Sequence, residues 1–253
     1  MGCGVRLSVR PGTPSNAARC VFHCPKQSHL RASGKLMITS GTTCAGRLAH
    51  HKSFVDANRP VHTSAMSDFV ESKRLVLRQF TSQDADLLIE LDSDPAVMRY
   101  LTGGEPELPA ALVRDQVIPS VLNAYERWNG RFGLFAAYEK ETGAFIGWFH
   151  LRPEPTGPQD EVELGYRLRQ DAWGKGYATE GSRALVDMGF SELGVSTVWG
   201  ATMALNVSSQ KVMEKVGMSI VESLPTPDDM QGVEGAECGG YRFEITREQW
   251  ERR

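Results

Sequence analysis

A glycine-rich turn lies between a predicted strand and a predicted helix in the second half of the chain. Residues 173–180 read Trp-Gly-Lys-Gly-Tyr-Ala-Thr-Glu and follow the alternating run 161–168. Two glycines one residue apart, Gly174 and Gly176, let the backbone turn tightly and approach a ligand closely. The amides that open the next helix point at that ligand, and the helix dipole favours negative charge there. The turn therefore predicts an anion cradle, in particular for a pyrophosphate.

Two known phosphate-binding patterns do not fit this turn. A Walker A loop needs a glycine where this chain has Arg169, and Ser or Thr where it has Gly176. A dinucleotide-binding fingerprint needs a third glycine, and Thr179 holds that place. The alternative that stays open is a strand-to-helix turn whose glycines serve only the backbone.

The composition divides the chain into two parts. Of its 253 residues, 41% are hydrophobic, which suffices for a soluble core, and no apolar run reaches the length of a membrane helix. Residues 1–65 carry nine basic residues and one acidic residue, whereas residues 66–253 carry 19 basic and 30 acidic residues. An acidic body argues against nucleic-acid binding. We predict neither a nucleic-acid nor a membrane partner.

The first 65 residues show no sustained helical or strand period. Their Ser-, Gly- and Arg-rich composition predicts a disordered basic extension. The segment is similar to a mitochondrial transit peptide, which is rich in Arg and Ser and poor in acids. The alternative is a mis-assigned start, because Met66 directly precedes the first strand. We predict one domain over 66–253, in the cytoplasm, or in the mitochondrial matrix where the extension is genuine.

Cysteine and histidine are concentrated in the extension, which leaves only Cys238 and His150 in the body. A body with one of each has neither a disulfide framework nor the ligands of a zinc site. We therefore predict no metal and interpret His150 as structural.

Periodicity along 66–253 predicts a mixed α/β (α+β) domain with an antiparallel first half. The predicted strands are 74–78, 132–138, 144–151, 161–168, 197–203, 219–222 and 241–245. The predicted helices are 81–91, 94–101, 110–128, 177–190 and 206–216. The glycine turn thus joins a strand to a helix.

Four segments in this order resemble the GNAT acetyltransferase family, and within it the RimJ/RimL-like branch that acetylates ribosomal-protein N-termini. The segments are 74–78 with Asp94-Pro95 and Met98, Ile146-Gly147-Trp148, 163–180, and 206–218. The resemblance implies the GNAT fold, a mixed sheet of six or seven strands flanked by helices. It also implies a splay between the fourth and fifth strands for the pantetheine of acetyl-CoA. The implied partners are acetyl-CoA and an amine acceptor, for a monomer or homodimer.

The resemblance also implies a set of site residues. The expected cofactor contacts are Leu168, Trp173, Gly174, Lys175, Gly176, Tyr177, Ala178, Thr179, Asn206 and Ser209. The backbone N–H of Leu168 corresponds to the family's oxyanion donor. We predict that Glu163, through a water, accepts the proton of the amine. Glu161 is its competitor, and a solvated strand carboxylate is the alternative interpretation.

Two positions depart from the wider family. Trp173 stands where Gln or Arg usually begins the phosphate loop, and Met213 stands where a Tyr general acid is common. A thioether cannot donate a proton, so we predict that Ser209 protonates the departing thiolate. The alternatives are an exposed helical Ser209 and an Asn206 that only caps a helix.

These residues together predict an N-acetyltransferase that moves an acetyl group to a primary amine, on a protein N-terminus or a small molecule. The amine would attack acetyl-CoA directly in a ternary complex. The alternative is a degenerate module that binds acyl-CoA as a sensor or scaffold without turnover.

Overall fold

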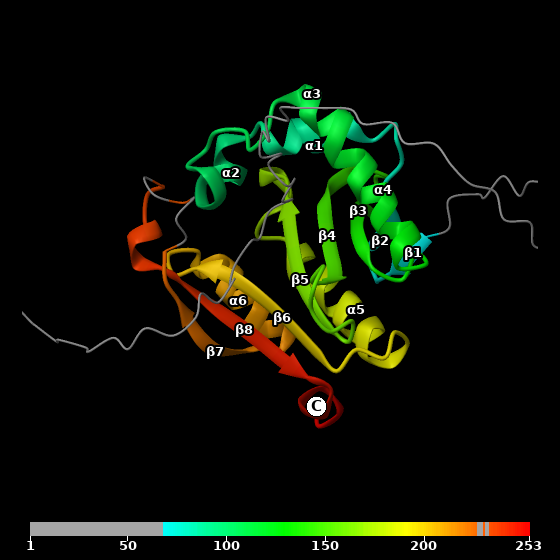
Figure 1. Cartoon of the computed structure of the whole chain (residues 1–253), viewed down its shortest axis with the longest axis vertical. Helices are drawn as coiled ribbons and strands as arrows, with labels where there is room; N and C mark the ends of the chain where they lie inside the picture. Colours follow the sequence, from blue (N-terminus) through cyan, green and yellow to red (C-terminus); the bar gives the residue numbers. More distant parts are fainter. Residues whose placement is uncertain (1–67, 227–229, 231–232) are drawn as a thin grey trace, which may run out of the picture. The chain divides into compact units, whose positions relative to one another are not determined.

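A mixed eight-stranded sheet forms the centre of the computed structural model, which describes residues 68–226, 230 and 233–253 (Figure 1). The strands are β1 Asp68–Glu71, β2 Leu75–Gln79, β3 Gly133–Glu139, β4 Phe145–Pro153, β5 Glu161–Leu168, β6 Thr197–Met203, β7 Ser219–Leu224 and β8 Gly240–Thr246. Their spatial order is β1-β2-β3-β4-β5-β6-β8-β7. Within the described residues, β5–β6 is the one parallel pair. The predicted extension, residues 1–65, lies outside the described residues.

The mixed α/β class and the antiparallel first half are confirmed, but the sheet has eight strands rather than six or seven. The additional strand is β1, which pairs antiparallel with β2 through an irregularity between Asp68 and Val70. Four residues are too few to show a clear alternation of apolar and polar side chains. Periodicity in the sequence therefore does not reveal this strand.

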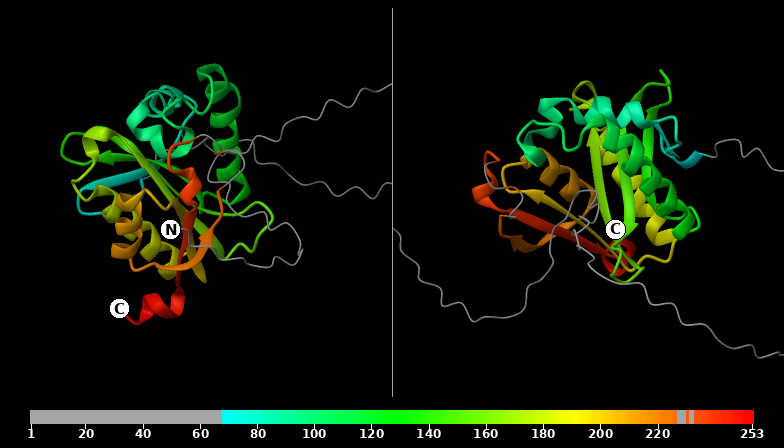
Figure 2. Two further views of the ribbon diagram at one scale, coloured as in Figure 1. Left: turned by 90° about the vertical axis from the view of Figure 1, so that its left-hand side faces the viewer. Right: turned by 45° about the horizontal axis from the view of Figure 1, so that its top comes forward.

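Helices cover both faces of the sheet (Figure 2). They are α1 Ala85–Asp92, α2 Pro95–Thr102, α3 Ala110–Leu112, α4 Ile118–Arg127, α5 Tyr177–Ser191, α6 Val207–Val216 and α7 Arg247–Glu251. Short 3₁₀ turns stand at η2 Gln170–Ala172 and η4 Ala236–Cys238. On β4, Phe149 faces Gly181 of α5, whereas its neighbour Trp148 lies with Leu88 of α1. Because strand side chains alternate, α1 and α5 lie on opposite faces.

The predicted helix 110–128 is interrupted by a π-helical turn, η1 Val113–Val117, between α3 and α4. Pro119 lies two residues after this turn, in the first turn of α4. A proline cannot donate to the carbonyl four residues before it, and its ring crowds that carbonyl. The wider π turn accommodates this conflict without ending the helix.

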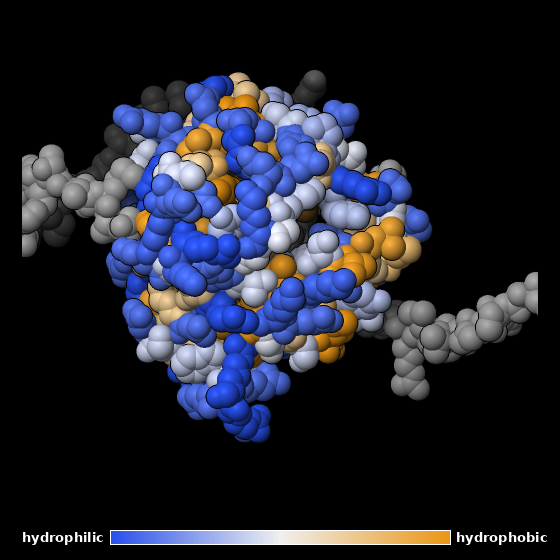
Figure 3. Space-filling model, turned by 180° about the vertical axis from the view of Figure 1, so that it is seen from behind, coloured by the Kyte–Doolittle hydropathy of each residue, from blue (hydrophilic) through white to orange (hydrophobic). Residues whose placement is uncertain are grey.

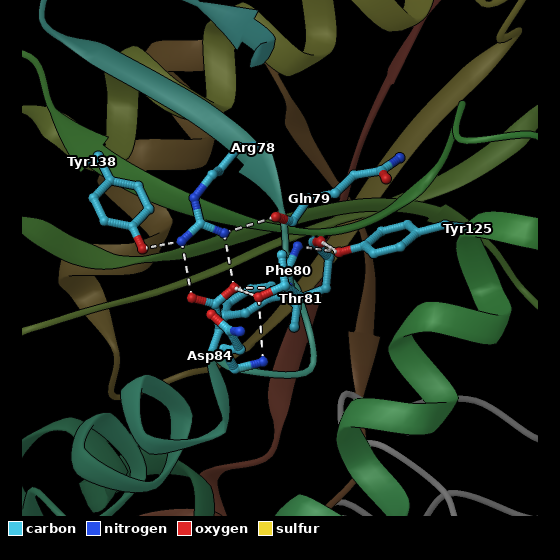
Figure 4. Close-up of polar contacts among 9 residues, drawn as sticks. Arg78, Gln79, Phe80, Thr81, Asp84, Tyr125 and Tyr138 are labelled. Atoms are coloured by element: carbon cyan, nitrogen blue, oxygen red, sulfur yellow. Dashed lines mark hydrogen bonds and ion pairs between the residues drawn. The ribbon is translucent and has the colours of Figure 1, made fainter. Parts of the chain in front are cut away.

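A polar network fixes the start of α1 to the sheet (Figure 4). Arg78 of β2 holds both carboxylate oxygens of Asp84, at 2.8 and 2.9 Å, and donates to the hydroxyl of Tyr138. Asp84 also accepts from the backbone N–H and the hydroxyl of Thr81, at 2.7 and 2.8 Å. Burial works to raise the pKa of Asp84, but the hydrogen bonds from Arg78 and Thr81 outweigh it and lower that pKa.

Tyr125 of α4 fixes the same loop from its other side (Figure 4). Its buried hydroxyl accepts from the N–H of Phe80 at 2.9 Å and donates to the carbonyl of Leu134. Tyr125 and Phe132 belong to the core, and Trp128 packs against it. These aromatic residues therefore support the scaffold.

The face opposite the view of Figure 1 is mostly hydrophilic, with hydrophobic residues in separate patches (Figure 3). Among the residues that the structure describes, no helix is long and apolar enough to cross a membrane.

Replacing Asp84 by Asn should lower the free energy of unfolding by about 3 kcal/mol, because it leaves a largely buried Arg78 without its counter-charge. The folded-state pKa of Asp84 is lowered. Its stabilisation is therefore present above the ordinary pKa of about 4 and is lost as pH falls through the folded value. Urea unfolding of both proteins should show the difference at pH 7 and a smaller one at pH 3.

The matched control is Asp86→Asn, the same chemical change at an exposed position of α1 that pairs with Arg114. We expect it to change stability by no more than about 0.5 kcal/mol. Equal losses for the two variants would contradict a special role for the Asp84 network.

Candidate functional site

The glycine turn is present at the end of β5. Gly174 and Gly176 have φ angles of 73° and 83°, in the left-handed region that other residues rarely adopt. A Cβ at Gly174 would meet nothing within 4 Å. This glycine therefore serves the backbone conformation, and the space beside it is open to a ligand. Gly176 is the N-cap of α5, whose first N–H groups have no helical partner.

An ion pair that the sequence analysis missed holds the turn from the side of β2. Glu180 of α5 accepts from the Ser72 hydroxyl at 2.8 Å, and from the backbone N–H and Nε of Arg74 at 2.6 and 2.7 Å. Arg74 also donates to the carbonyl of Lys175 at 3.0 Å and lies over the ring of Tyr177. Burial works to raise the pKa of Glu180, but these hydrogen bonds outweigh it and lower that pKa. The sequence feature that could have indicated this contact is Glu180 itself, an acidic residue in the first turn of the predicted helix.

The structure brings most of the predicted cofactor residues together in this turn. Trp173, Gly174, Lys175 and Gly176 are exposed, and Ala178 and Thr179 are half-buried in the first turn of α5. Tyr177 is buried, with its hydroxyl on Glu139. Tyr177 can therefore offer its backbone N–H while its side chain anchors the helix.

The expected splay between the fourth and fifth predicted strands is confirmed between β5 and β6. Their parallel pairing covers only Glu161 with Thr197, Val162 with Val198 and Glu163 with Trp199. Beyond Glu163, β5 pairs with β4 alone, and the two strands diverge (Figure 1). We call this opening the β5–β6 splay.

The backbone of β5 directs N–H groups into the β5–β6 splay. Arg169 donates its N–H to the carbonyl of Ile146 on β4. Because backbone groups alternate in direction along a strand, the N–H groups of Leu168 and Tyr166 point away from β4. The Leu168 carbonyl on that side accepts from the indole Nε1 of Trp173 at 2.8 Å. The Leu168 N–H thus points into the β5–β6 splay, on the side where β5 has no strand partner.

Glu163 lies on the α1 face of β5, within a buried polar strip. It is 3% exposed, so a solvated carboxylate is excluded. Arg152 of β4 donates to its Oε2 from Nε and Nη2, at 3.1 and 2.9 Å. His150 Nε2 lies 3.4 Å from the same oxygen. Glu161 is exposed at the start of the strand, so Glu163 is the carboxylate of the two that reaches the interior.

His150 is buried within this strip. Burial lowers its pKa, as does the positive charge of Arg152, while Glu163 works in the opposite direction. The imidazole lies against Gly165, where a Cβ would approach Cε1 and Nε2 to 2.6 Å. The absence of a side chain at Gly165 therefore makes room for His150. This agrees with a structural role for His150.

A pair of hydroxyl groups lies on the opposite face of β5, towards α6. The Tyr166 and Ser209 hydroxyl oxygens are 2.8 Å apart. Burial raises the pKa of Tyr166 to about 12, while its contact with Ser209 works to lower it. Asn206 accepts from the N–H of Ser209 at 3.1 Å, so it does cap α6. Met213, at the position of the usual Tyr, is 2% exposed and packs under Gly200.

Sequence reasoning missed Tyr166 as the partner of Ser209. The two residues are 43 positions apart, and only the packing of α6 on β5 joins them. The alternation of β5 was a partial signal, because it places Tyr166 on the face opposite to Glu163. Within the described residues, no group of three or more His, Cys, Asp or Glu could hold a metal.

A family model described as an acetyltransferase (GNAT) domain matches residues 74–219. The chain belongs to the GNAT acetyltransferase family. This GNAT chain is 34% identical over 187 residues to the FsC-acetyl coenzyme A-N(2)-transacetylase of Aspergillus fumigatus, covering 72% of this chain and 77% of that protein. As a member of this family, the protein is an N-acetyltransferase.

Solved GNAT structures share the fold. An acetyltransferase from Bacillus anthracis matches with a TM-score of 0.59 and 22% identity, over 71% of this chain and 98% of that chain. A putative ribosomal-protein-serine acetyltransferase from Vibrio cholerae matches with a TM-score of 0.55 and 18% identity, over 70% and 96%. Identities this low establish the GNAT fold and leave the acceptor open.

Replacing Gly165 by Ala should destabilise the protein by about 2 kcal/mol, because the new methyl group overlaps the His150 ring. Thermal unfolding of the single variants and of the double variant with His150→Ala measures the coupling. We expect the Gly165→Ala penalty to shrink markedly once the imidazole is gone. An unchanged penalty would show that the strand itself, and not His150, rejects the side chain.

Proposed function

We propose that this protein transfers the acetyl group of acetyl-CoA to a primary amine by direct attack in a ternary complex. The observation that carries the proposal is the β5–β6 splay, with proton-handling groups on opposite faces of one strand. Glu163 lies on the α1 face, and Tyr166 with Ser209 lies on the α6 face. The amine would attack from the α1 face of β5, and the CoA thiol would leave on the α6 face. The groups that handle the two protons must therefore lie on opposite faces of the strand. The name of the fungal relative, which includes acetyl coenzyme A, supports the co-substrate.

The glycine turn and the splay would hold acetyl-CoA along its length. The N–H groups from Gly174 to Thr179 belong to the turn before the 15-residue helix α5 and to its first turn, and they would bind the pyrophosphate. Lys175 is exposed beside them and adds positive charge. The pantetheine would lie in the β5–β6 splay, where β5 has no strand partner, with Asn206 and Ser209 at its α6 side.

The proton transfers follow from these positions. Glu163, through a water, takes a proton from the amine as the new C–N bond forms. The Leu168 N–H donates to the oxyanion that develops on the carbonyl. As the C–S bond breaks, Ser209 gives its proton to the sulfur and recovers one from Tyr166, which is reprotonated from solvent as the products leave. Binding the amine and the thioester in line with each other lowers the activation barrier of acetyl transfer by several kcal/mol more.

The acceptor is a protein N-terminus or a small amine. The resemblance to the RimJ/RimL-like branch favours the N-terminus, and the Vibrio cholerae structure named for a ribosomal-protein serine, which shares the fold, suggests ribosomal-protein peptides as acceptors to test. The fungal relative is named for an N(2) position. These names describe the Vibrio cholerae and Aspergillus fumigatus proteins. For the present protein they indicate which acceptors to test.

The test is release of free CoA thiol from acetyl-CoA by the full chain, with ribosomal-protein N-terminal peptides, polyamines and aminoglycosides as acceptors. We expect acceptor-dependent release, and about a 100-fold lower turnover for Glu163→Gln at unchanged acetyl-CoA affinity. Glu161→Gln, an exposed carboxylate two residues away, is the matched control. Binding of acetyl-CoA without release for any acceptor would favour the sensor alternative. Equal turnover of the two variants would remove Glu163 as the base.

Replacing Tyr166 by Phe should lower the turnover rate by about 10- to 100-fold, because Ser209 loses the hydroxyl that restores its proton. If Tyr166 only supported the fold, its replacement would leave the pKa of the thiol of bound CoA unchanged. We therefore predict a higher thiol pKa for CoA bound to Tyr166→Phe, read from thiolate absorbance with the unliganded protein subtracted. Ser209→Ala should act in the same direction. Unchanged absorbance titrations in both variants would contradict this proton route.

A further inference from the structure

Arg74, directly before β2, contacts the glycine turn at three positions. Its guanidinium donates from Nη1 to the carbonyl of Lys175 at 3.0 Å and from Nε to Glu180 at 2.7 Å. The guanidinium carbon also lies 4.4 Å from the centre of the Tyr177 ring. One side chain from another strand therefore holds the turn and the first helical turn of α5 together.

Arg74 is itself held on both its backbone and its side chain. Its N–H donates to Glu180 at 2.6 Å, and its carbonyl accepts from the N–H of Lys140 at 2.8 Å. Its Nη2 lies 3.5 Å from the position that a Cβ of Gly176 would take. The guanidinium thus packs beside this glycine and presents its Nη1 donor in a defined direction.

The contact with the Lys175 carbonyl sets the direction of the Gly176 N–H. The peptide bond between the two residues is planar and trans, so its C=O and its N–H point in opposite directions. Because Arg74 holds the carbonyl on its own side of the turn, the N–H points to the other side. Among the described residues this N–H has no acceptor, and Gly176 is exposed. The N–H is therefore available to a ligand.

The chain by itself does not fix this direction. Turning the peptide over changes the φ angle of Gly176, which is 83°, and glycine adopts positive and negative φ about equally well. In the opposite orientation the Lys175 carbonyl would face the ligand. A carbonyl oxygen carries partial negative charge and would repel a phosphate. The hydrogen bond from Arg74 therefore selects the orientation that can bind an anion.

We propose that Arg74 is a positioning residue of the glycine turn: by holding the Lys175 carbonyl, it keeps the Gly176 N–H directed at the pyrophosphate of acetyl-CoA. This inference rests on the proposed function, in which the turn binds that pyrophosphate. Glu180 takes part, because it holds both the backbone N–H and the Nε of Arg74. Arg74 acts on the binding of the co-substrate and not on the reacting atoms, so its loss should affect KM far more than kcat.

Arg74→Lys in the full chain tests the proposal, because lysine keeps the positive charge but lacks the rigid fork of nitrogens that reaches Glu180 and Lys175 together. We expect the dissociation constant for acetyl-CoA, measured by calorimetry, to rise roughly 10-fold, the effect of losing one hydrogen bond to a charged group. KM for acetyl-CoA should rise in parallel, while kcat changes by less than about 2-fold. An unchanged dissociation constant would mean that charge alone suffices and would overturn the proposal. No acetyl-CoA binding by the unmodified chain would overturn the proposed function instead.

The matched control is Arg131→Lys. Arg131 also donates from an exposed guanidinium to a backbone carbonyl, that of Leu193, at 2.7 Å. Leu193 lies between α5 and β6, at the end of α5 opposite to the glycine turn. This variant should keep the wild-type dissociation constant and KM. A loss equal to that of Arg74→Lys would show a general effect of removing a surface guanidinium and would contradict the proposal.

S-Acetylpantetheine separates positioning of the turn from support of the fold, because it carries the thioester and lacks the pyrophosphate. Its kcat/KM, taken from the slope at low concentration, should be the same for Arg74→Lys and the unmodified chain. A loss that matches the loss with acetyl-CoA would show that Arg74 supports the whole domain, and the positioning role would be wrong.

Glu180→Gln is a milder second variant, because the amide keeps one acceptor oxygen while the ion pair with Arg74 is lost. It should raise the dissociation constant for acetyl-CoA in the same direction. Since both residues act through one contact, the double variant with Arg74→Lys should bind little more weakly than the weaker of the two single variants. Fully additive effects would show that the two residues act separately and would count against the proposal.

Discussion

The parallel pairing of β5 with β6 ends after Glu163, and the geometry of the site depends on that end point. Beyond it, the backbone groups on one side of β5 lie inside the domain without a neighbouring strand, and such groups need partners. The Trp173 indole satisfies the Leu168 carbonyl. An extended ligand with its own amides can satisfy the others as a missing strand would. In the proposed function, this unpaired stretch of β5 is where the pantetheine lies.

One strand supplies opposite chemical functions because its side chains alternate. Glu163, Gly165 and Arg167 face α1, whereas Leu164, Tyr166 and Leu168 face α6. The sheet keeps the Glu163 carboxylate and the Tyr166–Ser209 hydroxyl pair on opposite faces, so they do not hydrogen-bond to each other. Each group can then act on the partner that enters from its own side.

The sequence predicts well what local rules determine. The glycine turn, the range of β6 and the end of α6 at Gly217 follow from backbone conformation and periodicity. Contacts that depend on strand register or on the packing of a helix against the sheet cannot be predicted from backbone conformation and periodicity. Arg152 reaches Glu163 through the β4–β5 register, and Ser209 reaches Tyr166 only once α6 packs on β5. The interpretation of Glu163 as a solvated carboxylate fails for the same reason.

Arg167 links β5 to the end of α1. Asp92 holds its guanidinium from the end of α1, and the Arg78–Asp84 network fixes the start of that helix. A single side chain therefore couples the position of the neighbouring Leu168 to both ends of α1.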